Sequence, residues 1–332
     1  MSNPIAIYSG GTVLYWSAIV ISLGLLAALL MTISLHAANG GRGWAVCLLL
    51  TLTVLFSVPL CRALHWYCHA EQYGGLAAAL RDYSTGSYVL SGALAGAWLA
   101  ALIAARLEGR SGAALLDAFA PGAALAVAFI RLSALFNSSC RSKIAVTTPA
   151  LQHLPLASGV TNSAGVVEYR FATFFVQFLL MLLICFLLLA FFCLRRARPM
   201  KSGAAEGNTA RMFLLLYCAV ELVLDSTRYD SSFLPINGFI SLVQIVSALS
   251  ILALLIYYSV HSLRANGRQR LHWLLWGLWL LGLAAVGVFE DLVQRHGDWF
   301  LLCYGVMTLG SLAMSFAVWR MYRSCCAPAQ AS

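Results

Sequence analysis

The sequence predicts an all-α fold, a polytopic membrane helix bundle with about nine transmembrane helices. Of the 332 residues, 61% are hydrophobic and only 10% are charged, and the mean hydropathy is +0.83. A soluble domain carries about 25% charged residues, so this chain cannot hide its apolar surface in a water-soluble core. Apolar runs close to the roughly 20 residues that cross the hydrocarbon core recur along the chain. The same composition excludes disordered, collagen-like, coiled-coil and disulfide-scaffold proteins.

Nine apolar runs define the predicted spans. They are Thr12–Leu35, Trp44–Leu60, Ser91–Ala105, Leu115–Phe136, Phe171–Leu194, Met212–Asp225, Gly238–Val260, Leu271–Val288 and Trp299–Tyr322. The longest polar connection, Asn137–Tyr169, is rich in Ser, Thr, Gly and Pro, and we expect it to form an external loop. Gly75–Asp82, with the sequence GLAAALRD, is expected to form a short interfacial helix.

The basic residues predict the orientation of the bundle. The formal net charge is +9, but Lys and Arg mostly occupy short connections between apolar runs, which indicates membrane topology and no nucleic-acid partner. With the N-terminus outside and the C-terminus in the cytoplasm, thirteen basic residues face the cytoplasm and seven face outward. The positive-inside rule favours this orientation. The ten cysteines form no CxxC pair, so we predict neither a disulfide framework nor a metal site from them.

Several polar side chains occupy positions where a membrane makes them costly, at roughly 2.5–3.5 kcal/mol for a mid-membrane charge. They are Arg131 in the fourth span, Gln177 in the fifth, Tyr217, Glu221, Asp225 and Arg228 in or just after the sixth, and Gln244 in the seventh. The four of the sixth span fall within an arc of about 80° when successive residues turn by about 100°. With the predicted orientation, the whole group lies in the outer half of the membrane. We therefore expect a polar cavity open toward the outer leaflet.

The arginines of this group indicate which ligand such a cavity would take. A guanidinium presents a planar fork that suits phosphate or carboxylate, and the abundant phosphate of the outer leaflet is a lipid head group. The alternative interpretation is structural: Arg131 pairs with Glu221 or Asp225 and only ties helices together. The convergence of the whole group at one depth favours a ligand site.

Around Arg131 the sequence resembles a known enzyme family. Residues 117–121 (DAFAP) and 128–137 (AFIRLSALFN) are similar to the Asp-x-x-Ala-Pro and Gly-Arg-(Ile/Leu)-Gly-Asn-Phe-Ile-Asn-Gly-Glu motifs of prolipoprotein diacylglyceryl transferases. Further landmarks follow in the family's order: Arg62, then residues 91–96, 217–228 and 238–246. The resemblance covers about residues 1–262. It implies a transferase-like domain of seven helices at 1–262 and a C-terminal extension at 263–332 with two further membrane helices.

The motifs match the family only in part. The retained positions are Arg131, Asn137, Tyr217, Arg228 and Gln244, and Asp225 replaces a glutamate. The departures are Ser91 in place of a histidine that is the proposed general base, Ala134 in place of an asparagine, Ser139 in place of a glutamate and Glu221 in place of an arginine. The phosphate-binding side of the site therefore resembles the family more closely than the proton-handling side does.

The resemblance implies a reaction and its participants. The family moves a diacylglyceryl group from phosphatidylglycerol to the lipobox cysteine thiol of a preprolipoprotein, glycerol phosphate leaves, and no metal or other cofactor is needed. The implied partners are phosphatidylglycerol, the preprolipoprotein signal peptide and membrane lipid, in the bacterial plasma membrane. The implied catalytic residues are Arg131, Asp225, Arg228 and Ser91, with the two arginines holding the phosphate. The implied substrate-binding residues are Asn137, Tyr217, Glu221, Gln244 and Arg62.

Two other functions are alternatives to the transferase. The first is a catalytically inactive relative that binds anionic lipid or lipoprotein signal segments, which predicts lipid binding without turnover. The second is a membrane transporter for a small anion, which predicts a polar path that continues to the cytoplasmic side. The inner halves of the fourth to seventh spans carry little charge, which disfavours transport.

Overall fold

The computed structural model describes residues 5–9, 12–82, 90–136, 142–162, 165–197, 206–229, 231–234, 238–267, 270–297 and 299–326. The predicted polytopic membrane bundle is confirmed, because eight described helices are long and apolar enough to cross a membrane. The long helices are α1 (Trp16–Ala38), α2 (Gly43–Cys68), α4 (Leu90–Glu108), α5 (Gly112–Ser133), α7 (Thr173–Ala197), α8 (Asn208–Leu224), α9 (Leu242–Asn266), α10 (Arg270–His296) and α11 (Phe300–Cys326).

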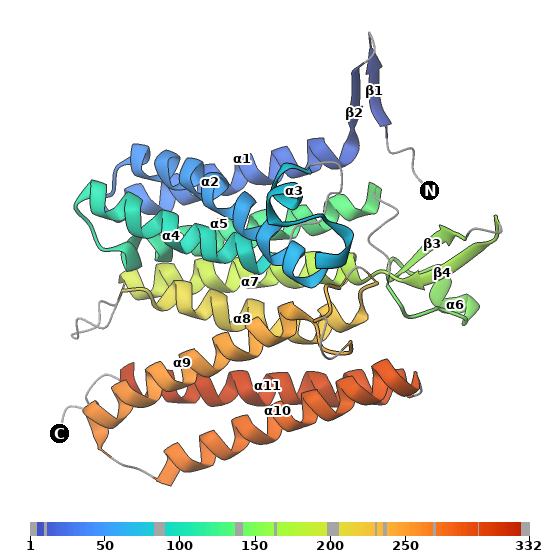
Figure 1. The fold of residues 1–332 in the computed structure, drawn as a ribbon. Coiled ribbons are helices and arrows are strands. Elements are labelled where there is room, and N and C mark those ends of the chain that lie inside the picture. The colour runs from blue at the N-terminus through green and yellow to red at the C-terminus, as the bar shows by residue number, and fades with distance from the viewer. Residues whose placement is uncertain are drawn as a thin grey trace.

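Short elements gather at one end of the bundle, which we call the hairpin end (Figure 1). They are the antiparallel pair β1 (Ile5–Ser9) and β2 (Thr12–Tyr15), helix α3 (Leu76–Arg81), helix α6 (Pro149–Gln152) and the antiparallel pair β3 (Ala157–Thr161) and β4 (Val167–Phe171). The last turn of α11 lies at the opposite end (Figure 1). The short helix expected at 75–82 is confirmed as α3, and its place at the membrane interface stays a prediction. The β3–β4 hairpin in the expected external loop was not predicted.

The sixth predicted span, Met212–Asp225, has the wrong bounds. Helix α8 begins at Asn208 and ends at Leu224 after 17 residues, so it is shorter than the eight candidate spans. It continues directly into a 3-10 turn at Asp225–Thr227. Where the α-helix ends, the carboxylate of Asp225 accepts a hydrogen bond from the hydroxyl of Ser241.

Two further helices, α1 and α9, begin four residues later than predicted. The segment Thr12–Tyr15 (TVLY) is a strand and not the start of the first span, because its β-branched and aromatic residues pair with Ile5–Ser9. The seventh span begins at Leu242 and not at Gly238, because Ser241 caps the helix. The Ser241 hydroxyl accepts from the backbone N–H of Gln244, and the Gln244 side chain accepts from the backbone N–H of Ser241.

Small residues allow the helices to approach closely. A Cβ atom added to Gly96 on α4 would lie 2.6 Å from the backbone nitrogen of Ser57 on α2, and one added to Gly92 would lie 2.6 Å from the backbone nitrogen of Cys61. Gly122 on α5 would meet the carbonyl oxygen of Ala28 on α1 at 2.8 Å in the same way. Close backbone approach through glycine is typical of helix pairs in membranes, where apolar surface by itself gives no preference between a helix and lipid.

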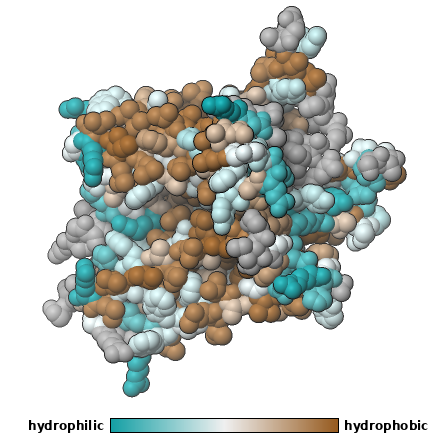
Figure 2. Space-filling view, in the orientation of Figure 1, coloured by the Kyte–Doolittle hydropathy of each residue, from teal (hydrophilic) through white to brown (hydrophobic). Residues whose placement is uncertain are grey.

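One hydrophobic core joins α5 with helices α7 to α11. Its buried members come from α5, α7, α8, α9, α10 and α11, and include Met181, Leu255 and Met314. The last two helices therefore pack into the same core as their predecessors. Apolar side chains also cover the outer flanks of the helices, while polar side chains gather mainly near the helix ends (Figure 2). In the most apolar windows of the candidate spans, at most 50% of residues are buried inside the protein, which leaves the rest for lipid.

Candidate active site

Three helices meet around a buried carboxylate near the hairpin end. Glu221 of α8 is only 1% exposed, and its carboxylate lies 3.2 Å from the guanidinium of Arg131, near the C-terminal end of α5. The side-chain amide of Gln177, in the second turn of α7, donates to both Glu221 oxygens at 3.3 Å. The structure thus brings together three residues that the sequence placed on separate spans. It also shows that Arg131 makes one of the helix-tying pairs that the structural alternative predicts.

The pairing with Glu221 leaves hydrogen-bonding groups of the site unused. The Arg131 Nε atom is buried and makes no hydrogen bond with any described residue, and the same holds for the hydroxyl of Tyr217. Tyr217 lies one turn before Glu221 on α8, and the charges of Glu221, Arg131 and Arg228 all act on its hydroxyl. Buried polar atoms in proteins are almost always paired, so unpaired ones clustered at one place are typical of a ligand site.

Arg228 follows α8 at the end of the 3-10 turn. Its guanidinium lies 3.7 Å from the carboxylate of Asp225, which is buried and also accepts a hydrogen bond from Ser241 on the loop before α9. The charge of Arg131 acts on Asp225 as well. Asp225 is therefore held by Ser241 on one side and lies beside Arg228 on the other, so it can orient the Arg228 guanidinium.

A strand-like segment that the sequence did not identify holds this turn in place. Ser142 forms an antiparallel bridge with Arg228, and its hydroxyl donates to the carbonyl of Thr227 at 3.0 Å. The backbone N–H of Lys143 donates to the same carbonyl at 2.9 Å. The Thr227 hydroxyl also lies 2.7 Å from that of Thr173 at the start of α7. The only sequence signal was the position of Ser142 and Lys143 directly after the stretch that resembles the family motif.

Gln244 joins the start of α9 to the end of α8. It is buried, its carbonyl oxygen accepts from the backbone of Ser241, and its amide donates to the carbonyl of Leu222 on α8 at 3.3 Å. These contacts fix the start of α9 against the end of α8. The predicted contact of Gln244 with substrate stays a prediction.

Arg62 and Ser91 lie on a different helix pair. Arg62, near the end of α2, is buried, donates from Nε to the carbonyl of Ala79 at 3.1 Å and lies 3.9 Å from Asp82, so it binds α3 to α2. Ser91 lies in the first turn of α4, beside the close contact of α4 with α2, and its buried hydroxyl makes no hydrogen bond with a described residue. The contacts described here do not join either residue to Arg131. The predicted site residue Asn137 lies outside the described residues.

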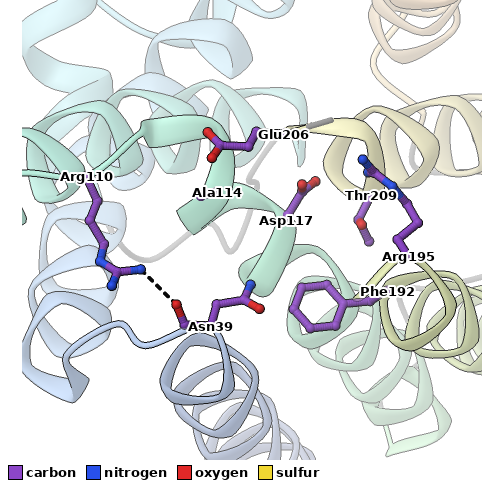
Figure 3. Close-up of a pocket in the computed structure, with 8 residues that line it drawn as sticks. All are labelled: Asn39, Arg110, Ala114, Asp117, Phe192, Arg195, Glu206 and Thr209. Atoms are coloured by element: carbon purple, nitrogen blue, oxygen red, sulfur yellow. Dashed lines mark hydrogen bonds between the residues drawn. The ribbon is translucent and has the colours of Figure 1, made fainter. Parts of the chain in front are cut away.

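A cavity of about 300 Å³ lies at the other end of the bundle. Figure 3 shows the side chains that line it, which are Asn39, Arg110, Ala114, Asp117, Phe192, Arg195, Glu206 and Thr209. Asp117 caps α8 from here, because its carboxylate accepts from the backbone N–H groups of Gly207 at 2.7 Å and Ala210 at 2.9 Å. Asp117 and Arg131 lie fourteen residues apart on α5, about 21 Å along the axis, so this cavity is separate from the Arg131 site.

Comparison with known proteins identifies the scaffold that carries these groups. The family model of prolipoprotein diacylglyceryl transferase matches residues 4–260. The chain belongs to this family. Membership in the prolipoprotein diacylglyceryl transferase family confirms the resemblance seen in the sequence and supports a transferase that moves a diacylglyceryl group from phosphatidylglycerol to a prolipoprotein cysteine. The match ends within α9, so α10 and α11 lie beyond it. The comparison with curated proteins found no match.

Proposed function

We propose that this multi-pass membrane protein acts in the bacterial plasma membrane, where it transfers the diacylglyceryl group of phosphatidylglycerol to the lipobox cysteine thiol of a preprolipoprotein. The thiol sulfur forms a bond to the glyceryl carbon, the bond from that carbon to the phosphate oxygen breaks, and glycerol phosphate leaves. The observation that carries this proposal is the pair of unused donors, Arg131 Nε and the Tyr217 hydroxyl, beside the Arg131–Glu221 pair. Both donors suit a phosphate oxygen.

The two arginines supply the positive charge that the leaving group requires. Negative charge grows on the phosphate as the carbon–oxygen bond breaks, and a preorganised cation in a site that excludes water stabilises it. Arg131 supplies a guanidinium from α5, and Arg228 supplies one from the turn after α8, where Asp225 orients it. Both charges act on Tyr217 and on Asp225, which supports one shared electrostatic site. Glu221 binds Arg131 at Nη2, which leaves Nε for an oxygen of the lipid phosphate.

The acceptor thiol needs a group that takes or shares its proton. Ser91 stands at the position of the family's histidine, and its hydroxyl is unpaired within the described part of the chain. Serine is a weak base, so we assign Ser91 only a hydrogen bond to the incoming thiol. The thiol proton ends on the departing glycerol phosphate, whose oxygen takes the electron pair of the broken carbon–oxygen bond. We place the hairpin end outside, where the predicted orientation puts Arg131 in the outer half of the membrane.

The test is a transfer assay with the full-length purified protein. The protein is reconstituted with phosphatidylglycerol and incubated with a synthetic lipobox peptide. The expected result is a peptide whose mass increases by one diacylglyceryl group, with release of an equal amount of glycerol phosphate. A peptide with serine in place of the lipobox cysteine, and vesicles of phosphatidylethanolamine alone, serve as controls. Lipid binding without any mass increase under these conditions would contradict the proposal.

A further inference from the structure

The two helices beyond the family match carry polar side chains into the bundle. Glu290 on α10 is only 2% exposed, and Gln294 lies one turn later on the same helix. Tyr304 and Ser311 on α11 add two hydroxyl groups, and that of Ser311 donates to the backbone carbonyl of Ala219 on α8 at 2.8 Å. Burying polar groups inside a membrane protein costs free energy, so polar side chains that face the interior of the bundle usually have a structural or functional role.

Two of these side chains, Gln294 and Tyr304, converge on the turn that presents Arg228. The amide of Gln294 donates to the backbone carbonyl of Ser226 at 3.4 Å and lies 3.3 Å from its hydroxyl, which in turn lies 3.3 Å from the hydroxyl of Tyr304. Ser226 is buried and follows Asp225 directly in the chain. The α10–α11 hairpin therefore contacts the residue between Asp225 and Thr227.

Gln294 also connects the turn to a lysine. Its carbonyl oxygen accepts a hydrogen bond from Lys143 Nζ at 3.0 Å, while its amide donates to Glu290 Oε1 at 2.8 Å. These two bonds fix which way the Gln294 amide points, because an ammonium only donates and a carboxylate only accepts. The second oxygen of Glu290, Oε2, is buried and makes no hydrogen bond with a described residue.

Two carboxylates offset part of the effect of burying the Lys143 ammonium. Burial lowers the pKa of Lys143, and the carboxylates of Glu290 and Asp225 oppose this effect. The other charged groups nearby are Arg228, whose backbone pairs with Ser142, and Arg170, which donates to the carbonyl of Lys143 at 3.5 Å and pairs with Glu168. The ammonium lies 4.3 Å from the ring centre of Phe233. The bond to Gln294 uses one of the three N–H donors of the Lys143 ammonium.

We propose that Lys143 is a third cation of the phosphate site and that the α10–α11 hairpin, through Gln294 and Glu290, holds it against the Asp225–Arg228 turn. This inference rests on the proposed function. Lys143 adds a donor for the phosphate that leaves, next to Arg228. Gln294 and Glu290 are positioning residues, because they act through Lys143 and need not touch substrate. The extension beyond the family match would thus complete the site.

The test compares pH profiles of variants in two measurements. The first is kcat/KM for transfer to the lipobox peptide between pH 6 and 10, and the second is binding of phosphatidylglycerol nanodiscs over the same range. Loss of the Lys143 proton gives both profiles a falling alkaline limb. In Glu290→Gln a negative neighbour is absent, the pKa of Lys143 falls, and the limb moves to lower pH by roughly one unit. Lys143→Ala lowers kcat/KM by roughly 10- to 100-fold.

Two controls separate this role from a general structural one. In Lys143→Arg the guanidinium stays charged between pH 6 and 10, so the alkaline limb disappears from the profile. Adding Glu290→Gln to this variant should therefore leave the profile unchanged. Ser311→Ala removes a polar contact of the same hairpin with α8 but leaves the Lys143 contacts intact, so its limb stays where the parent's is.

The outcomes distinguish this inference from the proposed function. Two results would overturn the role of the hairpin even if the protein forms thioether product. In one, Glu290→Gln leaves the alkaline limb of the pH profile at the parent's pH. In the other, Glu290→Gln still shifts an alkaline limb when Lys143 is replaced by arginine. Absence of product at every pH refutes the proposed function alone, provided that lipid binding still shows the Glu290-dependent shift. Absence of that shift from both transfer and binding refutes the inference.

Discussion

The contact between Arg131 and Glu221 permits a direct test of whether Arg131 serves catalysis or only structure. In Arg131→Gln the guanidinium is absent, and among the described residues the Glu221 carboxylate, 1% exposed, retains the Gln177 amide at 3.3 Å. This variant therefore combines two losses. One is the stabilising partner of a buried carboxylate, and the other is a cation beside the substrate phosphate.

Each loss has its own magnitude. Breaking a buried ion pair from one side costs about 3–5 kcal/mol of the free energy of unfolding, because an uncompensated charge remains. A fall of roughly 5–10 °C in the unfolding midpoint would follow. Removing a preorganised group that stabilises charge in the transition state costs about 2.7–4 kcal/mol, or roughly 100- to 1,000-fold in turnover. Both effects are large enough to measure separately.

The double variant Arg131→Gln/Glu221→Gln separates them. It contains neither charge, and its two amides can pair with each other and with Gln177, so we expect most of the lost stability to return. Transfer should stay at least about 100-fold below the parent, because no guanidinium is restored. Stability is followed by the fluorescence of the nine tryptophans during heating in detergent. Activity is followed by the mass increase of the lipobox peptide. If the double variant recovers transfer together with stability, Arg131 only ties helices and the assignment is wrong.

Three further predictions concern other parts of the molecule. Ser91→His should raise transfer, because it restores an imidazole base at the family's position; a peptide assay that shows no gain or a loss would contradict this alignment through α4. Gly96→Val should lower the free energy of unfolding by at least about 1–3 kcal/mol, because its Cβ would lie 2.6 Å from the backbone of Ser57; an unchanged unfolding midpoint would show that α2 and α4 pack differently. Asp117→Ala should cost about 0.5–2 kcal/mol by removing the cap of α8, with little direct effect on lipid binding; a selective loss of phosphatidylglycerol binding at unchanged stability would contradict that structural role.

The location of the polar groups depends on packing that no local pattern encodes. Lys143 and Gln294 are 151 residues apart in the chain, and Arg131 and Glu221 are 90 residues apart. Local hydropathy gives the existence of each helix, but the rotation of a helix about its axis is set by its neighbours. For that reason Ser142 and Lys143, in a connection expected only as an external loop, became part of the candidate site only with the tertiary structure.

The sequence by itself determined that this is a multi-pass helical membrane protein, that Tyr217 and Glu221 share a face of one helix, and that the Arg131 region resembles the transferase family. These properties depend on composition, periodicity and short motifs, which are local. The tertiary structure alone decided that Glu221 binds Arg131 and Gln177, that the Gln244 amide binds the Leu222 carbonyl of α8, and that Arg62 and Ser91 lie on a separate helix pair. Those outcomes depend on close approach between segments distant in the chain, and steric fit and hydrogen bonding select that approach only when the whole bundle is assembled.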